Sequence, residues 1–131
     1  MSTSYRVEIE SFAENHFIRS FSRKYKKAWD FTLSALIREF QTFDVIMERR
    51  IARPISDKNS IIAIYKTEFK IAGTGESRHG SGNRCIVAVH KDTSTVHVLL
   101  VYHKNDLSGH NETSEWKKIV RDNYPEYSSL I

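Results

Sequence analysis

The chain has 131 residues, of which 40% are hydrophobic and 27% are charged. This balance is typical of a folded globular protein and excludes a disordered chain, and the length fits a single domain over residues 1–131. Lys and Arg number 20 against 16 Asp and Glu, a modest excess that permits an anionic partner without requiring one.

The cysteine count and the hydropathy of the chain indicate a compartment. The single cysteine, Cys85, excludes an internal disulfide and suits a reducing environment. No apolar run approaches the length of a membrane span, and residues 1–6 lack the apolar core of a signal peptide. We therefore expect a cytoplasmic protein with no membrane partner.

The first third of the chain predicts a strand followed by two helices. Residues 5–9 alternate apolar and charged side chains, as a half-buried strand does. Residues 13–28 carry aromatic side chains at intervals of four, one stripe of an amphipathic helix. Asp30 or Thr32 can cap a second helix. The expected buried face of that helix comprises Leu33, Leu36, Ile37 and Phe40.

Basic side chains crowd the first predicted helix and the turn after it. They are Arg19, Arg23, Lys24, Lys26 and Lys27. Such a cluster is more often a solvated helix face than a ligand site. Residues 42–50 either extend the second helix or form a separate turn, and Arg53–Pro54 marks a break, because proline disfavours helix in the residue before it.

Three strand-like runs follow, over residues 61–71, 84–90 and 95–104. In an extended strand, side chains two residues apart point the same way, so Lys66, Glu68 and Lys70 are expected to share one face. If the three runs pair as a meander, Lys70, Arg84 and Lys104 converge on one patch. Cations placed on rigid sheet suggest a site that grips phosphate.

A glycine-rich segment, residues 73–83, separates the first two runs. Gly75 and Gly80 have the separation of a phosphate-binding P-loop, but Ser81 stands where that motif needs lysine, and a strand follows instead of a helix. We interpret the segment as a hairpin loop whose Arg78 and His79 can close over a ligand. Residues 91–95 predict a tight turn between the next two runs.

The C-terminal part predicts a polar segment over residues 108–113 and a last helix to residue 122, with Trp116, Ile119 and Val120 facing inward. The element order is thus β-α-α-β-β-β-α. We predict an α+β fold in which the helix pair covers one face of a mostly antiparallel four-stranded sheet and leaves the other face free for a site.

The side chains indicate chemistry without a metal or cofactor. The sequence has no His-x-x-x-His and no Cys-x-x-Cys spacing. Tyr102, His103 and Lys104 close the third run, either as an ordinary strand end or as functional groups on a rigid scaffold. Cleavage of a phosphodiester needs a base for the ribose 2′-OH, cations for the developing charge and an acid for the leaving 5′-oxygen. Lys, Arg, Tyr and His side chains can divide these roles.

Three segments resemble the RelE/ParE superfamily of toxins from type II toxin–antitoxin modules. They are residues 65–75, 81–89 and 98–106. Members similarly carry a strand with basic residues, a glycine-rich turn, a strand that opens with arginine, and an apolar strand that ends in aromatic and basic residues. The resemblance implies a RelE-like fold and a cognate antitoxin as partner. For the RelE-like branch it further implies cleavage of mRNA in the ribosomal A site through the 2′-OH, without metal.

The resemblance also implies roles for single residues. The catalytic set would be Lys66 and Lys70 as base and phosphate clamp, Arg84 as the stabiliser of transition-state charge, Lys104 as a second basic residue, and Tyr102 or His103 in acid–base or stacking roles. The RNA-contacting set would be Arg19, Arg23, Lys24, Lys26 and Lys27 on the first helix, with Arg78 and His79 in the loop.

The sequence departs from the family pattern at Glu68, in extra length between Asp44 and Ser60, and in having no assigned catalytic tyrosine near the C-terminus. Two further functions stay open. Glu68 sits between the two strand lysines, where it can neutralise one of them. A ParE-like toxin that binds DNA gyrase without catalysis is one alternative, and a non-cleaving RNA-binding module on the same fold is the other. Lys66, Lys70 and Arg84 favour the nuclease, because ParE-like proteins generally lack this basic cluster.

Overall fold

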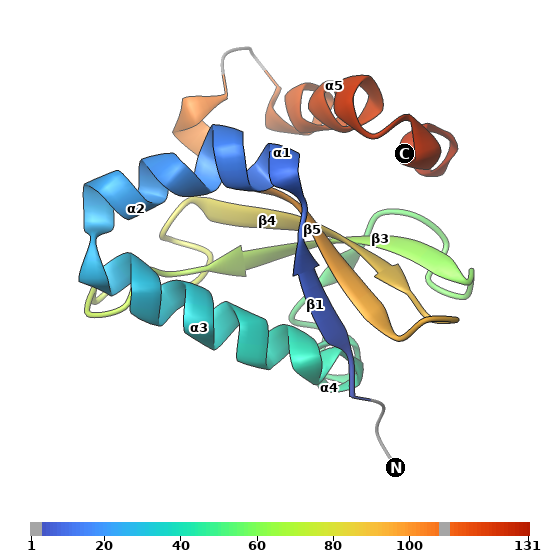
Figure 1. Ribbon diagram of the computed structural model, residues 1–131, viewed down its shortest axis with the longest axis horizontal. Coiled ribbons are helices and arrows are strands. Elements are labelled where there is room, and N and C mark those ends of the chain that lie inside the picture. Colours follow the sequence, from blue (N-terminus) through green and yellow to red (C-terminus); the bar gives the residue numbers. More distant parts are fainter. Residues whose placement is uncertain (1–3, 108–110) are drawn as a thin grey trace.

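A computed structural model of the chain describes residues 4–107 and 111–131. Part of the polar segment predicted over 108–113 therefore lies outside the described residues. The centre of the molecule is a five-stranded sheet with strand order β1-β5-β4-β3-β2 (Figure 1). Its strands are β1 (Arg6–Ile9), β2 (Arg53–Pro54), β3 (Ile62–Phe69), β4 (Asn83–His90) and β5 (Thr95–His103).

The predicted meander is present, and the sheet is mostly antiparallel as expected. β3 pairs with β4 and β4 with β5 in antiparallel register, whereas β1 joins the far side of β5 in parallel. The prediction of four strands is wrong, because the sheet has a fifth. The residues expected to form a break, Arg53–Pro54, are the short edge strand β2, in which Arg53 lies opposite Lys66. An edge strand tolerates proline, since its outer side needs no N–H donor.

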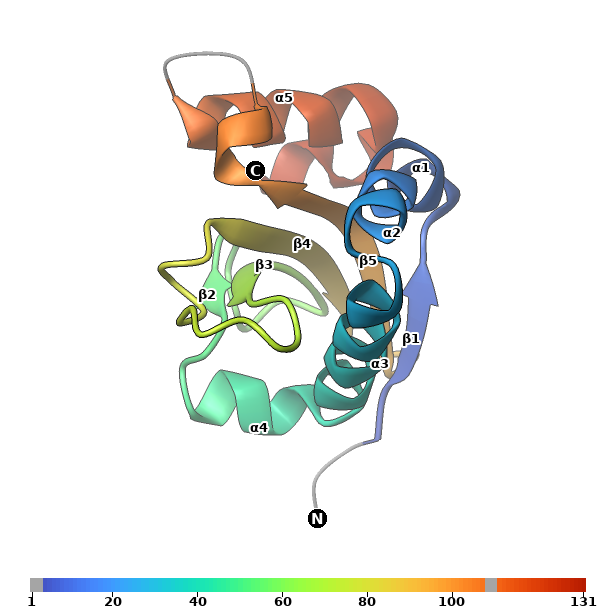
Figure 2. The same cartoon turned by 90° about the vertical axis from the view of Figure 1, so that its left-hand side faces the viewer.

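Helices cover one face of the sheet, as predicted. They are α2 (Arg19–Tyr25), α3 (Lys27–Gln41) and α4 (Phe43–Glu48). Before them come α1 (Ser11–Ala13) and a π-helical turn (Glu14–Ile18), whose Phe12 and Phe17 pack toward the other face. Phe21, Trp29 and Phe40 from α2 and α3 are buried in one core with Val87 and Val98 of the strands. α3 and α4 lie on the opposite side of the sheet from the last helix (Figure 2).

The boundary between the first two predicted helices is misplaced. The helix expected over residues 13–28 ends at Tyr25, because Lys26 has a φ of 54° that interrupts helical geometry, and α3 begins at once. Thr32 is therefore inside α3 and caps nothing. Its hydroxyl donates to the carbonyl of Ala28 at 2.8 Å and accepts from the amide of Ala72 at 2.8 Å, which ties the loop after β3 to this helix.

The second face of the sheet is also covered, so the prediction that it stays free is wrong. Helix α5 (Glu112–Asn123) and the 3-10 turns Lys104–Asp106 and Pro125–Leu130 follow β5. Trp116 and Val120 face inward as predicted, and they pack with Ile64, Ile86 and Leu100 in a second core. Strand β4 is apolar on both faces, so it requires cover on both sides. None of the helices within the described residues is both long and apolar enough to cross a bilayer.

We expect Asn111→Ala to lower the free energy of unfolding by about 1 kcal/mol. Asn111 is the N-cap of α5, and its side-chain oxygen accepts from the amide of Ser114 at 3.2 Å. Alanine leaves that amide without its partner. Urea denaturation measures the change, and Asn111→Asp, which keeps the acceptor, should retain most of the stability. Equal unfolding midpoints for all three proteins would show that α5 does not depend on this cap.

Candidate active site

A pocket of about 400 Å³ opens where β3 and β4 meet the start of α5. It is called the Arg84 pocket here, and it is lined by Arg50, Ile51, Arg53, Lys66, Glu68, His79, Arg84 and Glu112. Four cationic side chains, two carboxylates and one imidazole therefore face the same space. A net positive, partly enclosed pocket of this kind attracts an anionic group.

The sheet register explains why these residues meet. Lys66 and Glu68 lie two residues apart on β3 and share a face, as the period-two pattern predicted. Glu68 is opposite Arg84 on β4, and Arg84 is opposite Tyr102 on β5. This row belongs to the face that α5 covers, so the first turn of α5 brings Glu112 over it.

Glu112 connects the strand residues of the site. Its Oε2 accepts hydrogen bonds from the ammonium of Lys66 and from the hydroxyl of Tyr102, each at 2.7 Å. Its Oε1 has no hydrogen-bond partner within residues 4–107 and 111–131. Burial alone would raise the pKa of Glu112, but the bonds from Lys66 and Tyr102 outweigh burial and lower it. Glu112 is thus a carboxylate at neutral pH, with one oxygen open.

We expect this carboxylate to stabilise the fold above its unfolded pKa. Because the pKa of Glu112 is lowered on folding, its contribution is complete above pH 4.5, its ordinary value, and is lost as pH falls through the lower folded value. Between pH 7 and pH 3, the unfolding free energy of the wild type should therefore fall more steeply than that of Glu112→Gln. Chemical denaturation across this range measures both slopes, with Glu126→Gln, an exposed carboxylate outside the pocket, as control. Parallel curves for wild type and Glu112→Gln would contradict the assignment.

Arg84 is a cation held in a fixed position. It is only 4% exposed, and its guanidinium donates to the carbonyl of Asn83 at 3.1 Å and to that of His79 at 3.4 Å. The carboxylate of Glu68 lies 3.9 Å from its Nε. A charge fixed before substrate arrives needs no reorganisation during a reaction, which is the condition for electrostatic stabilisation of a transition state.

His79 and Glu68 form an acid–base pair beside Arg84. The Nδ1 of His79 lies 3.0 Å from Oε1 of Glu68, so the carboxylate orients the ring and leaves Nε2 available for proton exchange. Glu68 therefore does not neutralise a strand lysine, as its position between two of them had suggested. Lys66 is paired with Glu112 instead.

The structure does not bring all the predicted catalytic residues together. β3 ends at Phe69, so Lys70 leaves the shared face and lies in a separate groove against α3, which overturns the expected convergence of Lys70 with Arg84. Lys104 is exposed in the 3-10 turn and does not line the Arg84 pocket. His103 points to the opposite face of the sheet.

Tyr102 is buried beneath Glu112 and does not open to solvent. Burial and then the hydrogen bond to Glu112 raise the pKa of Tyr102 far above the ordinary value for a tyrosine. Its hydroxyl therefore stays protonated and acts as a fixed donor to the carboxylate. In this position Tyr102 can orient Glu112 but cannot serve as a proton acceptor.

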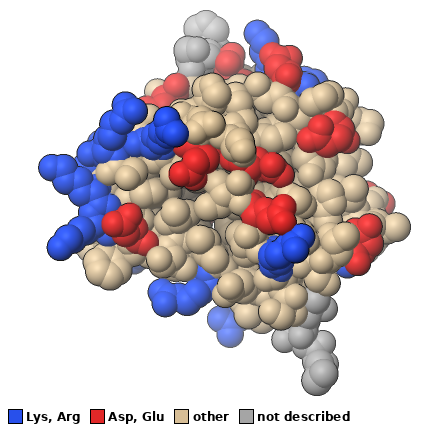
Figure 3. All heavy atoms as spheres, viewed as in Figure 1, with Lys and Arg blue, Asp and Glu red and all other residues tan. Residues whose placement is uncertain are grey.

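The predicted RNA-contacting residues divide into two groups. Lys and Arg side chains gather over α2 and the turn into α3, at the left of Figure 3. The five members of that cluster, all exposed, are Arg19, Arg23, Lys24, Lys26 and Lys27. They do not line the Arg84 pocket. Arg78 bonds to Glu39 on α3 and to the carbonyl of Glu68, so it fastens the loop, whereas His79 enters the pocket.

Three charged lining residues escaped the sequence prediction. Arg50 lies just before β2, Arg53 is the first residue of β2, and Glu112 belongs to the start of α5. The sequence did carry a signal for Glu112. Asn111 followed by an acidic residue is typical of a helix N-terminus, so the start of this helix could have been predicted. Over the described parts of the chain, 4–107 and 111–131, no group of three or more His, Cys, Asp or Glu side chains could hold a metal ion.

Comparisons with known proteins support the fold. The sequence matches no protein-family model and no curated protein. Among solved structures, it is similar to a chain of the archaeal RelE–RelB complex from Pyrococcus horikoshii OT3, with a TM-score of 0.50 and 13% identity over 79% of this chain and 99% of that chain. The chain therefore has a RelE-like α+β fold, which confirms the predicted fold in its coarse form.

Proposed function

We propose that residues 1–131 form a RelE-like toxin domain of a type II toxin–antitoxin module, which acts in the cytoplasm and cleaves mRNA in the ribosomal A site. The observation that carries the proposal is the Arg84 pocket, in which the His79–Glu68 pair stands beside two cations, Arg84 and Lys66. The similar chain belongs to a RelE–RelB complex, which supports a protein antitoxin as partner.

The pocket supplies each group that cleavage through the 2′-OH requires. The 2′-oxygen forms a bond to phosphorus as the bond from phosphorus to O5′ breaks. Oε1 of Glu112 accepts the proton of the 2′-OH, and Nε2 of protonated His79 donates a proton to the leaving O5′. Arg84 and Lys66 neutralise the charge that develops on the phosphoryl oxygens. The products are a 2′,3′-cyclic phosphate and a 5′-hydroxyl.

Cations around the pocket would hold the rest of the RNA. Arg50 and Arg53 line its outer side and can bind flanking phosphates. The exposed cluster over α2 and the turn into α3 would contact ribosomal RNA through its phosphates, so association with the ribosome should weaken as salt rises. Lys70 and Lys104, which lie outside the pocket, would contribute at most to this general attraction.

Induction of the protein in bacteria, followed by mapping of mRNA 5′ ends, tests the proposal. The expected result is new 5′-hydroxyl ends within translated codons soon after induction, with arrest of translation. Cleavage should disappear when translation is blocked before elongation begins. Growth arrest with intact mRNA and DNA-damage signalling would instead indicate a gyrase-binding toxin. Ribosome association with intact mRNA would indicate an RNA-binding module that does not cleave.

A further inference from the structure

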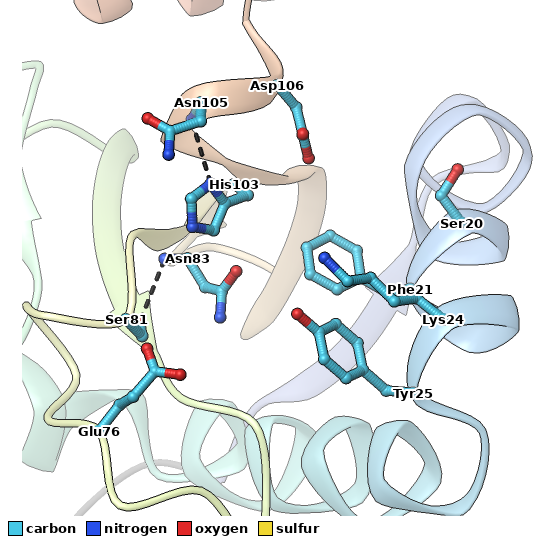
Figure 4. Close-up of a pocket in the computed structure, with 10 residues that line it drawn as sticks. All are labelled: Ser20, Phe21, Lys24, Tyr25, Glu76, Ser81, Asn83, His103, Asn105 and Asp106. Carbon is cyan, nitrogen blue, oxygen red and sulfur yellow. Dashed lines mark hydrogen bonds between the residues drawn. The ribbon is translucent and has the colours of Figure 1, made fainter.

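A second pocket, of about 330 Å³, lies between α2 and the ends of β4 and β5 (Figure 4). It is called the Asn83 pocket here, and it opens on the face of the sheet opposite Arg84. The lining side chains that define its chemistry are Lys24, Tyr25, Glu76, Asn83, His103 and Asp106. The catalytic scheme above uses none of them.

Asn83 marks this pocket as a binding site. The residue is only 3% exposed, and its Oδ1 is buried without a hydrogen-bond partner among the described residues. Its amide projects into the cavity between His103 and Tyr25 (Figure 4). A buried acceptor without a donor is costly in a folded protein, so a small rotation of the amide that brought Oδ1 to a ligand N–H would be favourable.

The wall beside Asn83 is rigid. The Nδ1 of His103 accepts from the amide of Asn105 at 3.1 Å, which fixes the ring. The ring lies directly against Gly82, where a Cβ would come within 2.6 Å of Nε2. A side chain at this position would have to displace the His103 ring, and the φ of 77° also favours glycine. The shape of the cavity is therefore set by the backbone of the loop before β4.

The polar groups of the pocket define the ligand. The carboxylates of Glu76 and Asp106 enter from opposite sides, and the amine of Lys24 and the hydroxyl of Tyr25 point toward the centre (Figure 4). The ligand must offer several N–H donors for the carboxylates and for Oδ1 of Asn83, together with an acceptor for Lys24. Lys24 rests 5.2 Å from the centroid of the Tyr25 ring, so its movement to a ligand acceptor would free that ring for stacking.

We propose that the Asn83 pocket binds one unpaired guanine base of the RNA substrate, an inference that rests on the proposed function. Proteins recognise single-stranded RNA by stacking splayed bases on aromatic rings and by hydrogen bonds to their edges. The edge of guanine carries N1–H and the N2 amino group next to the O6 acceptor. It offers more N–H donors than any other RNA base and still supplies an acceptor for lysine.

The two pockets are close enough in the chain to act on one RNA strand. Asn83 and Arg84 are consecutive on β4 and face opposite sides of the sheet. The loop before β4 supplies Glu76 to the Asn83 pocket and His79 to the Arg84 pocket. An RNA strand that passes around this loop would place its scissile phosphate at one pocket and a neighbouring base in the other.

The test is a titration of the 15N-labelled protein with GMP, AMP, CMP and UMP, which share a phosphate and differ only in the base. GMP should shift the amide signals of Asn83 and its neighbours and bind about tenfold or more tightly than the other three. Glu76→Gln, an exposed position that tolerates substitution, should remove the preference for GMP, and Glu126→Gln should not. Asn83→Leu, similar in shape without the buried acceptor, should remove it as well.

Several outcomes would overturn the inference. These are equal binding of the four nucleotides, no shift at the Asn83 pocket, or an unchanged preference in Glu76→Gln. Binding of N-acetylarginine amide at this pocket in place of GMP would indicate an anchor for a protein partner. Mapped cleavage separates this inference from the proposed function. Cleavage with no guanine near the cut sites would contradict the guanine pocket but not the nuclease function. Selective GMP binding without any cleavage would contradict the nuclease function but not the guanine pocket.

Discussion

Arg84→Ala should reduce mRNA cleavage by about a hundredfold or more, the usual cost of removing one preorganised group that stabilises transition-state charge. Arg84 lines the pocket from a buried position and is held by the carbonyls of Asn83 and His79. The cation that β3 supplies to the pocket, Lys66, has its charge paired with Glu112, whereas Arg84 is held mainly by carbonyls. Primer extension on a reporter mRNA in a cell-free translation reaction measures the rate.

Stability must be measured alongside, since truncation of Arg84 leaves two carbonyls without their donor. Arg84→Lys keeps the charge but not the planar fork, and it should recover part of the lost rate. Arg121→Ala, on the exposed side of α5, is the matched control and should cleave at the wild-type rate. A folded Arg84→Ala protein with full activity would show that the reaction takes place elsewhere.

His79→Gln should slow cleavage by 10² to 10⁴, roughly the range for loss of a positioned proton donor. Glutamine keeps a polar side chain near Glu68 but cannot transfer a proton. Because His79 is exposed, its replacement leaves the core intact, and thermal unfolding should be unchanged. The same cell-free reaction gives the rate, and a substrate with a better leaving group at O5′ should rescue the variant.

A matched pair of variants separates orientation from chemistry. Glu68→Gln retains a hydrogen-bond acceptor for Nδ1 and should lose less activity than His79→Gln. His16→Gln changes an exposed histidine outside the pocket and should have no effect on the rate. Equal rates for His79→Gln and wild type would remove His79 from the mechanism and leave the acid unassigned.

The strand pattern predicted the part of the site that lies within the sheet. A period of two placed Lys66 and Glu68 on one face, and antiparallel pairing brought Arg84 beside them. These are local consequences of strand geometry, so they can be read from one segment. The same argument gave the wrong place for Lys70, because the strand ends before it. Where a strand ends depends on tertiary contacts such as the hydrogen bond from the amide of Ala72 to the hydroxyl of Thr32.

The contribution of α5 could not be predicted in the same way. Glu112 is 46 residues from Lys66, and their contact follows from the packing of Trp116 and Val120 on the second face of the sheet. The sequence predicted which side of α5 is apolar but did not indicate which face of the sheet it covers. Both sheet faces are apolar along β4, so this choice needed the structure.

The late position of two pairings along the chain has a consequence for synthesis of the protein. β1, at residues 6–9, can pair only after residues 95–98 of β5 have been made. Glu112 reaches the pocket only when α5 has formed. Such long-range contacts form late in folding, and a nascent chain emerges from its N-terminus. The Arg84 pocket of a nascent chain therefore stays incomplete until nearly the whole sheet and the last helix have emerged from the ribosome. Under the proposed function, a nascent chain would therefore be unable to cleave the message from which it is being translated.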